Sequence, residues 1–131
     1  MYQASLIIAG QQHSTTVYSK ILNPSNGELV GLAPKANKDQ FESAVVAAKK
    51  AFYSWSTKSN EDRKEAVRAI ADQLEAHAEE LAILLTQEQG KPLNGLGSRF
   101  ELGGAVAWTR HTAELELPIE ILQDNEEGYL E

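Results

Sequence analysis

Few side chains in this sequence could do chemistry, because it has three histidines and no cysteine. The absence of cysteine removes disulfides, thiolate metal ligands and cysteine nucleophiles together. His13, His77 and His111 are far apart, and none has a second ligand pair at metal-binding spacing. His77 has Glu80 one helical turn later, but two such groups do not make a zinc site. The histidines therefore predict surface or capping roles and no metal site.

The segment 95–100, Gly-Leu-Gly-Ser-Arg-Phe, begins like a dinucleotide-binding fingerprint. Such a fingerprint needs a small third residue and a preceding strand, so that the pyrophosphate sits at a helix N-terminus. Here Phe100 stands where the fingerprint has its third glycine or another small residue, and no strand is expected before the segment. We expect a loop between helices and no cofactor-binding residue in this chain.

Catalytic patterns of other kinds do not support an enzyme site either. No serine stands in a Gly-x-Ser-x-Gly elbow, so the hydrolase class has no support. The adjacent carboxylates Glu79 and Glu80 point in different directions on a helix and indicate a solvated face. The sequence therefore offers no catalytic residue. No group of residues supports the alternative that the chain is a small, unrelated helical enzyme.

The net charge of −7 arises from one end of the chain. No lysine or arginine follows Arg110, whereas acids recur up to the last residue; they are Glu114, Glu116, Glu120, Asp124, Glu126, Glu127 and Glu131. An acidic end argues against nucleic acid or an anionic membrane as a partner. It is either a solvated end or a segment whose basic partners lie in further chain or in another subunit.

Length and composition indicate one soluble globular unit. The chain has 131 residues, of which 42% are hydrophobic and 24% charged, and no apolar run reaches the ~18 residues that a membrane-spanning helix needs. The first residues carry no basic region followed by an apolar stretch and a cleavage site. The expectation is a cytoplasmic protein.

The first third of the sequence predicts strands and turns. A short run at 6–9 should pair with 15–18 across a loop at 10–14. A second hairpin should join 21–22 to 29–33, with Asn26-Gly27 at the positive φ of a primed turn. This N-terminal β-hairpin region spans 1–36.

Residues 37–117 predict a helical region. Asn37 with Gln40, and Ser59 with Asp62, are capping boxes that begin the first two helices. The second helix should bend near Ala76-His77 and stop at Gly90. Apolar residues recur at helical spacing and mark one apolar face of each helix; they are Phe41, Val45, Ala48, Phe52 and Trp55 in the first helix, and Val67, Ile70, Leu74, Ala78, Leu81 and Leu85 in the second.

A further helix is expected from Ser98 to about Glu114. Gly103-Gly104 lies within it, which favours close packing against another backbone, and Phe100 and Trp108 are expected on or near its buried face. Beyond it, residues 118–131 predict an edge strand around Ile119 and Ile121, a loop at 124–128, and the beginning of another strand at 129–131.

Several motifs, in this order, resemble the N-terminal region of the aldehyde dehydrogenase superfamily. The run 6–10 resembles a hydrophobic strand and Asn-Gly turn, with Ala9 where asparagine is usual. The turn at 23–28 resembles Asn-Pro-x-x-Gly-Glu, and 47–55 resembles a helix ending Ala-Ala-x-x-Ala-Phe-x-x-Trp. Arg63 opens the next helix as in the family, and 88–92 resembles Glu-x-Gly-Lys-Pro. The resemblance covers essentially the whole chain.

The resemblance implies an α/β fold in part: short β-hairpins, three to four helices and a terminal β segment. It also implies that the NAD or NADP site, the nucleophilic cysteine, the general-base glutamate and the oxyanion-hole asparagine lie in later sequence. The helices would pack on the cofactor-binding domain. The helix from Ser98 resembles one bordering the aldehyde entrance tunnel, with Phe100 and Gly104 as candidate lining residues, and 118–131 resembles the start of the β arm that mediates oligomerisation.

Two functions from different classes remain open. The chain is either an N-terminal fragment of an NAD(P)-dependent aldehyde dehydrogenase, not catalytic alone, or a free-standing protein-interaction module derived from that fold. In both cases apolar faces are left without their partner, so self-association or binding to the remainder of the parent chain is expected. The residues that need such a partner are Phe41, Phe52, Trp55, Leu74, Leu81 and Trp108.

Overall fold

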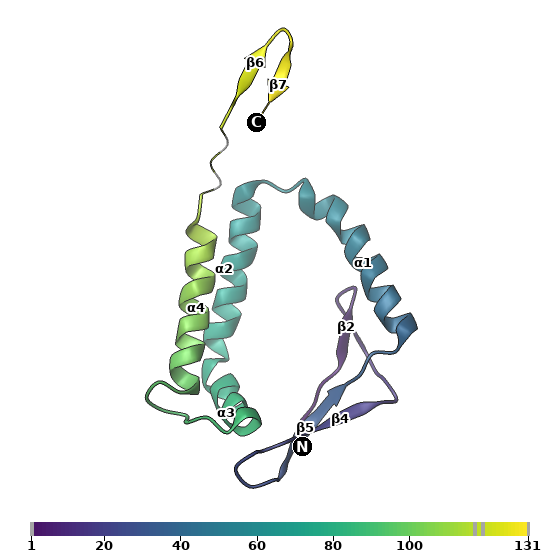
Figure 1. Cartoon of the computed structure of the whole chain (residues 1–131), viewed down its shortest axis with the longest axis vertical. Coiled ribbons are helices and arrows are strands. Elements are labelled where there is room, and N and C mark those ends of the chain that lie inside the picture. Colours follow the sequence, from purple (N-terminus) through teal and green to yellow (C-terminus); the bar gives the residue numbers. More distant parts are fainter. Residues whose placement is uncertain (1, 117, 119, 131) are drawn as a thin grey trace.

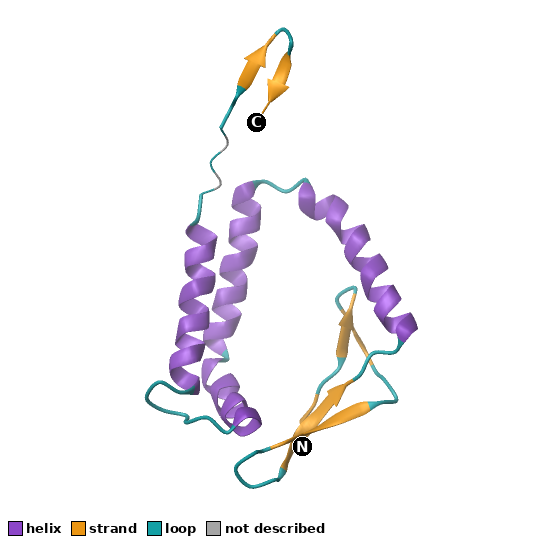
Figure 2. Ribbon diagram, in the orientation of Figure 1, coloured by secondary structure: helices purple, strands orange, loops and turns teal. Residues whose placement is uncertain are grey.

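The computed structural model describes residues 2–116, 118 and 120–130, and its elements follow the order β-strands, helices, β-hairpin (Figures 1 and 2). The elements are β1 (Tyr2–Gln3), β2 (Leu6–Ile8), β3 (Gln11–His13), β4 (Tyr18–Leu22), β5 (Leu29–Pro34), α1 (Lys38–Ser56), α2 (Asn60–Ala76), α3 (Ala78–Gln89), α4 (Ser98–Glu114), β6 (Gln123–Asn125) and β7 (Gly128–Leu130). Within this part of the chain no helix is long and apolar enough to cross a bilayer. The domain boundaries expected at 36/37 and 117/118 stay predictions.

The first hairpin differs from the expected one. β2 pairs antiparallel with β3, so Leu6 faces His13 and Ile8 faces Gln11. Ala9 and Gly10 form the turn, both with positive φ, at 52° and 75°. That backbone is typical of a two-residue primed turn, which matches the twist of the flanking strands. The predicted pairing of 6–9 with 15–18 was therefore wrong. The two-residue turn brings the polar run at 11–13 beside 6–8, and these two segments pair.

The second hairpin was predicted correctly except in its turn. β4 and β5 pair antiparallel, and β1 adds a parallel strand on the other side of β5. The loop between them is built by Asn23, whose carbonyl accepts from the amide of Gly27 and whose side chain accepts from Ser25. Gly27 has a φ of 74°, but Asn26 does not share the positive φ of a primed turn. The longer loop thus needs only one left-handed residue.

The helices begin and end where local signals place them. Capping boxes start α1 at Asn37 and α2 at Ser59, and each cap accepts from the backbone N–H three residues on. His77 separates α2 from α3, with its ring Nδ1 2.9 Å from the carbonyl oxygen of Gln73. Gly90 ends α3 with a φ of 70°. The predicted bend and stop are both confirmed.

The α2, α3 and α4 helices form the packed part of the molecule. α4 runs beside α2 in the opposite direction and also contacts α3, whereas α1 stands apart and contacts β2 (Figure 1). The buried apolar residues among those described are mostly small: Ile8, Ala71, Ala82, Val106 and Ala113. Small side chains allow close approach of the helices but bury little apolar area.

The C-terminal hairpin, β6 with β7, stands beyond the end of α4 (Figure 2). β6 covers Gln123–Asn125, part of the segment expected to be a loop, so that expectation was wrong in part; β7 confirms the strand expected near Tyr129. Residues 118 and 120–122 are not strand, so the edge strand expected there is absent from the described residues. The expected strand residue Ile119 lies outside the description.

Candidate docking surface

The face of α4 that carries the two candidate tunnel residues is open to solvent. Gly104 lines a shallow groove of about 360 Å³ with Ala107, Trp108 and His111. Phe100 lies on the same side one turn earlier, is 60% exposed and does not line that groove. The structure therefore brings Gly104 to Trp108 and leaves Phe100 beside them.

The opposite face of α4 is the one that packs. Ser98, Val106 and Ala113 are buried there, and the hydroxyl of Ser98 lies 2.8 Å from that of Thr86 on α3. Trp108 is 72% exposed, so the prediction that it and Phe100 approach the buried face was wrong. Side chains at four-residue spacing share one helical face. Phe100, Gly104 and Trp108 share the face of α4 that points away from α2.

The glycine pair in α4 does not mark a close contact within this chain. A Cβ at Gly103 or Gly104 would meet no heavy atom within 4 Å of the described structure. The predicted close packing against another backbone is therefore wrong for the chain by itself.

The apolar stripe of α1 is likewise uncovered. No α1 residue is buried, and Phe41, Phe52 and Trp55 are 65%, 62% and 44% exposed. The spacing predicted this helix and its single apolar face, and these residues were expected to lack a partner within this chain, as their exposure shows. A stripe of this kind needs a partner surface, because contiguous exposed apolar patches are uncommon on soluble monomers.

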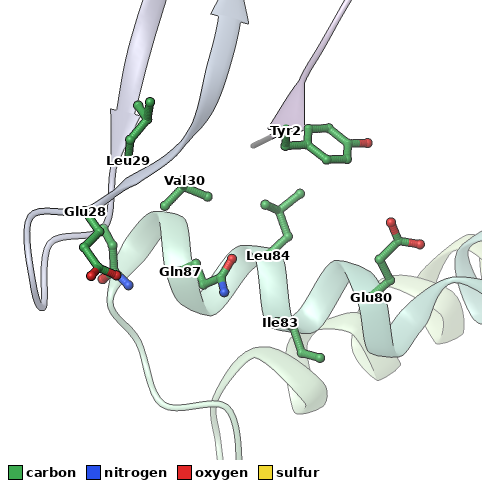
Figure 3. Close-up of a pocket in the computed structure, with 9 residues that line it drawn as sticks. Tyr2, Glu28, Leu29, Val30, Glu80, Ile83, Leu84 and Gln87 are labelled. Carbon is green, nitrogen blue, oxygen red and sulfur yellow. The ribbon is translucent and has the colours of Figure 1, made fainter.

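A groove between the sheet and α3 is the feature that sequence reasoning missed. Figure 3 shows Tyr2 of β1 and Val30 of β5 facing Leu84 and Glu80 of α3, around a hollow of about 370 Å³. Tyr2 also borders a neighbouring, mainly apolar hollow of about 570 Å³ between β1 and the α2–α3 junction. A two-residue strand has no periodicity of its own, so the sequence held no signal for it.

The loop at 95–100 serves its own helix. A Cβ at Gly97 would lie 1.8 Å from the carbonyl oxygen of Pro92, so only glycine fits. The same carbonyl accepts from the amide of Ser98, and that of Leu93 accepts from Arg99. The first donors of α4 are thus occupied by carbonyls of the preceding loop.

Charged side chains form ion pairs rather than a reaction centre. Hydrogen bonds from Arg68 lower the pKa of Glu61, and hydrogen bonds from Arg99 lower that of Glu79. These carboxylates contribute stability above their ordinary pKa of about 4.5 and lose it as the pH falls below that value. Among the described residues no group of three His, Cys, Asp or Glu side chains could hold a metal ion.

Two motifs that are distant in sequence meet in this structure. Pro24, in the turn of the second hairpin, lies against Gly90 at the end of α3, and a Cβ there would be 2.7 Å from its Cγ. The sequence of residues 10–124 matches the aldehyde dehydrogenase family. The chain belongs to the aldehyde dehydrogenase family.

Relatives of this family chain are much longer than it is. A probable aldehyde dehydrogenase from a Pseudomonas species is 42% identical over 87% of the chain, which covers 23% of that relative. An NAD-dependent aldehyde dehydrogenase from Sinorhizobium meliloti superposes with a TM-score of 0.80 at 29% identity, over 86% of the chain and 23% of its own. A betaine aldehyde dehydrogenase mutant from Staphylococcus aureus, crystallised with NAD+, superposes with a TM-score of 0.75 at 32% identity. The match covers 82% of this chain and 22% of that protein.

The aldehyde dehydrogenase chain described here thus spans about a quarter of the length of these relatives. The strands and four helices of the described residues form a partial α/β fold that is similar to part of these relatives' fold, as the sequence predicted.

Proposed function

We propose that this chain supplies the N-terminal part of an NAD(P)-dependent aldehyde dehydrogenase that oxidises an aldehyde to a carboxylic acid. Family membership and the quarter-length match support the proposal. The observation that carries it is the match itself: 86% of the chain superposes on a relative, and over three quarters of that relative lies outside the match. The chain would act as scaffold, and NAD or NADP would bind to the remainder.

The uncovered faces supply the second support. The stripe of α1, with Phe41, Phe52 and Trp55, and the α4 face with Trp108 are exposed here. In the whole protein the α1 stripe would pack against the cofactor-binding part. Phe100 and Gly104 would border the path by which the aldehyde enters, since both lie on the exposed face of α4, where Gly104 lines the groove and Phe100 lies one turn earlier. The proposal includes a cytoplasmic location, which cell fractionation would test.

A chimera tests the proposal. The matching quarter of the Pseudomonas relative is replaced by this chain, and aldehyde-dependent formation of NADH or NADPH is measured. We expect activity in the chimera and none in the relative with that segment deleted or in the 131-residue chain alone. A soluble, folded chimera without activity, or turnover by the chain alone, would contradict the proposal.

A matched pair of variants shows whether the exposed stripe matters. Phe52→Asp in the chimera should abolish soluble protein, because it places a charge in the proposed buried contact between α1 and the cofactor-binding part. Lys49→Asp, on the same helix and outside the stripe, should leave activity near that of the parent chimera. An interaction module that has lost the enzyme would instead give an inactive chimera whichever residue is changed.

A further inference from the structure

The antiparallel pair of α2–α3 with α4 carries ion pairs along its whole length. Read from the start of α2, the partners on α4 and just beyond it follow in reverse order. The pairs are Lys64–Glu116, Arg68–Glu114, Asp72 and Glu75 with Arg110, and Glu79–Arg99. The sign of the charge changes part-way: bases lie on the first half of α2, and acids lie on its second half and on α3.

The outermost pair differs from an ordinary surface pair. Only 10% of the Lys64 side chain is exposed, whereas Glu116 is 81% exposed, and Nζ lies 2.7 Å from Oε1. A buried ammonium is costly unless it is paired, so Lys64 needs a carboxylate at this place. Glu116 is therefore held on α2 although it lies beyond the last residue of α4.

The adjacent pair strengthens this arrangement. Arg68 Nε donates to Glu114 at 3.1 Å, while another nitrogen of its guanidinium donates to Glu61 at 2.7 Å. Glu114 is the last residue of α4, where the helix dipole favours a cation over an anion. Its placement is explained by the partner on α2 rather than by its own helix.

We propose that Lys64 and Arg68 form a clamp that fixes the direction in which the chain leaves α4. Leu115 between the two clamped acids is already extended, with φ −63° and ψ 133°. The direction of the chain at Leu115 and Glu116, where it leaves α4, is thus set by two contacts with α2. The clamp is a conformational device. When both ion pairs are formed, the chain leaves α4 in one direction; when they are broken, that direction is no longer fixed.

Spin labels on the complete 131-residue chain test the clamp, because the sequence has no native cysteine. One label replaces Glu65, on the exposed side of α2, and the other replaces Glu120, beyond the clamped acids. The labelled chain is mixed with an excess of unlabelled chain, so that pulsed EPR gives the distribution of distances between the two labels within one chain even where chains associate. We expect a narrow distribution in the otherwise unchanged chain, and its loss in Glu116→Gln and in Lys64→Gln.

Two further variants separate a clamp from a general effect on folding. The charge swap Lys64→Glu with Glu116→Lys should restore the narrow distribution, because it keeps the pair in reversed order. Lys38→Gln removes the exposed Lys38–Glu42 pair of α1 and should change nothing. Circular dichroism reports helix content throughout. Glu116→Gln lies outside every helix, so a narrow distribution in that variant would overturn the proposal, as would a folded charge swap that stays broad.

Discussion

A single residue, Ala9, shows how local strain enters this fold. Its φ of 52° lies in the left-handed region, which costs a residue with a Cβ roughly 1–2 kcal/mol. Asparagine tolerates that region and is preferred before glycine in two-residue turns. The resemblance had marked this position as one where the family usually has asparagine, and the turn geometry gives the physical reason.

The prediction at this scale concerns Ala9→Asn. It should raise the free energy of unfolding of the chain by about 1 kcal/mol, because it relieves the strained turn. Urea unfolding followed by circular dichroism measures the change. Ala9→Val, with a β-branched side chain at the same φ, should have the opposite effect. An asparagine variant no more stable than the parent would show that the turn is not strained.

Residue roles set by local chemistry could be predicted from the sequence, and roles set by distant packing could not. The caps Asn37 and Ser59 and the stop at Gly90 depend on neighbours a few residues away. The exposure of Phe41 and Trp108 depends on which surfaces are available to cover them. Helical spacing reports that such residues share a face, but it does not report what lies opposite.

At the scale of elements, the glycines around α4 separate two demands. Gly97 is required because a backbone carbonyl leaves no space for a Cβ. At Gly103, within α4, a Cβ would meet no neighbouring atom. Glycine within a helix is less stable than alanine by up to about 1 kcal/mol. The same residue type is thus structural at one position and destabilising at the other.

Two alanine variants test this contrast. Gly97→Ala should destabilise the chain by more than about 2 kcal/mol, because the backbone before α4 must shift. Gly103→Ala should stabilise it by up to about 1 kcal/mol. Thermal unfolding measures both. Equal midpoints for the two variants would contradict the assignment. In the chimera, a loss of activity in Gly103→Ala would indicate that another backbone packs there in the whole enzyme.

The errors in the predicted elements have the same origin as those in burial. β1 was missed because its two residues gain strand structure only from a parallel partner, β5, far along the chain. The first hairpin was assigned to the β-branched run at 15–18 because propensity favours it, but the turn geometry selected the polar run at 11–13. The groove at Gly104 on α4 was not predicted, and the role of Phe100 and Gly104 as lining of an aldehyde path stays a prediction.

For the whole molecule, the balance between buried and exposed apolar residues predicts association. The buried apolar residues are mostly small, whereas large ones such as Phe52, Trp55 and Trp108 are exposed. We expect the purified chain to form a dimer or larger species, since orphaned apolar faces cover each other. Light scattering after size exclusion, with and without NAD(P)+, measures this.

The controls for association follow from the two uncovered faces. Phe52→Asp together with Trp108→Asp should shift the chain toward monomer, and Lys49→Asp should not. Added cofactor should leave the assembly unchanged, because the family resemblance implies that the cofactor site lies in later sequence. A clean monomer that NAD(P)+ stabilises or shifts would contradict both expectations.

The contact between Pro24 and Gly90 has a consequence for how these sequences can diverge. Gly90 needs its left-handed φ, and the proline ring leaves no space for a Cβ even in a residue that tolerates that φ. An asparagine at 90 would therefore become acceptable only in a chain that also carries a smaller residue at 24. The two motifs, though separated by a hairpin strand and three helices, form one constraint, and substitutions at their contact are expected to arise as a coupled pair.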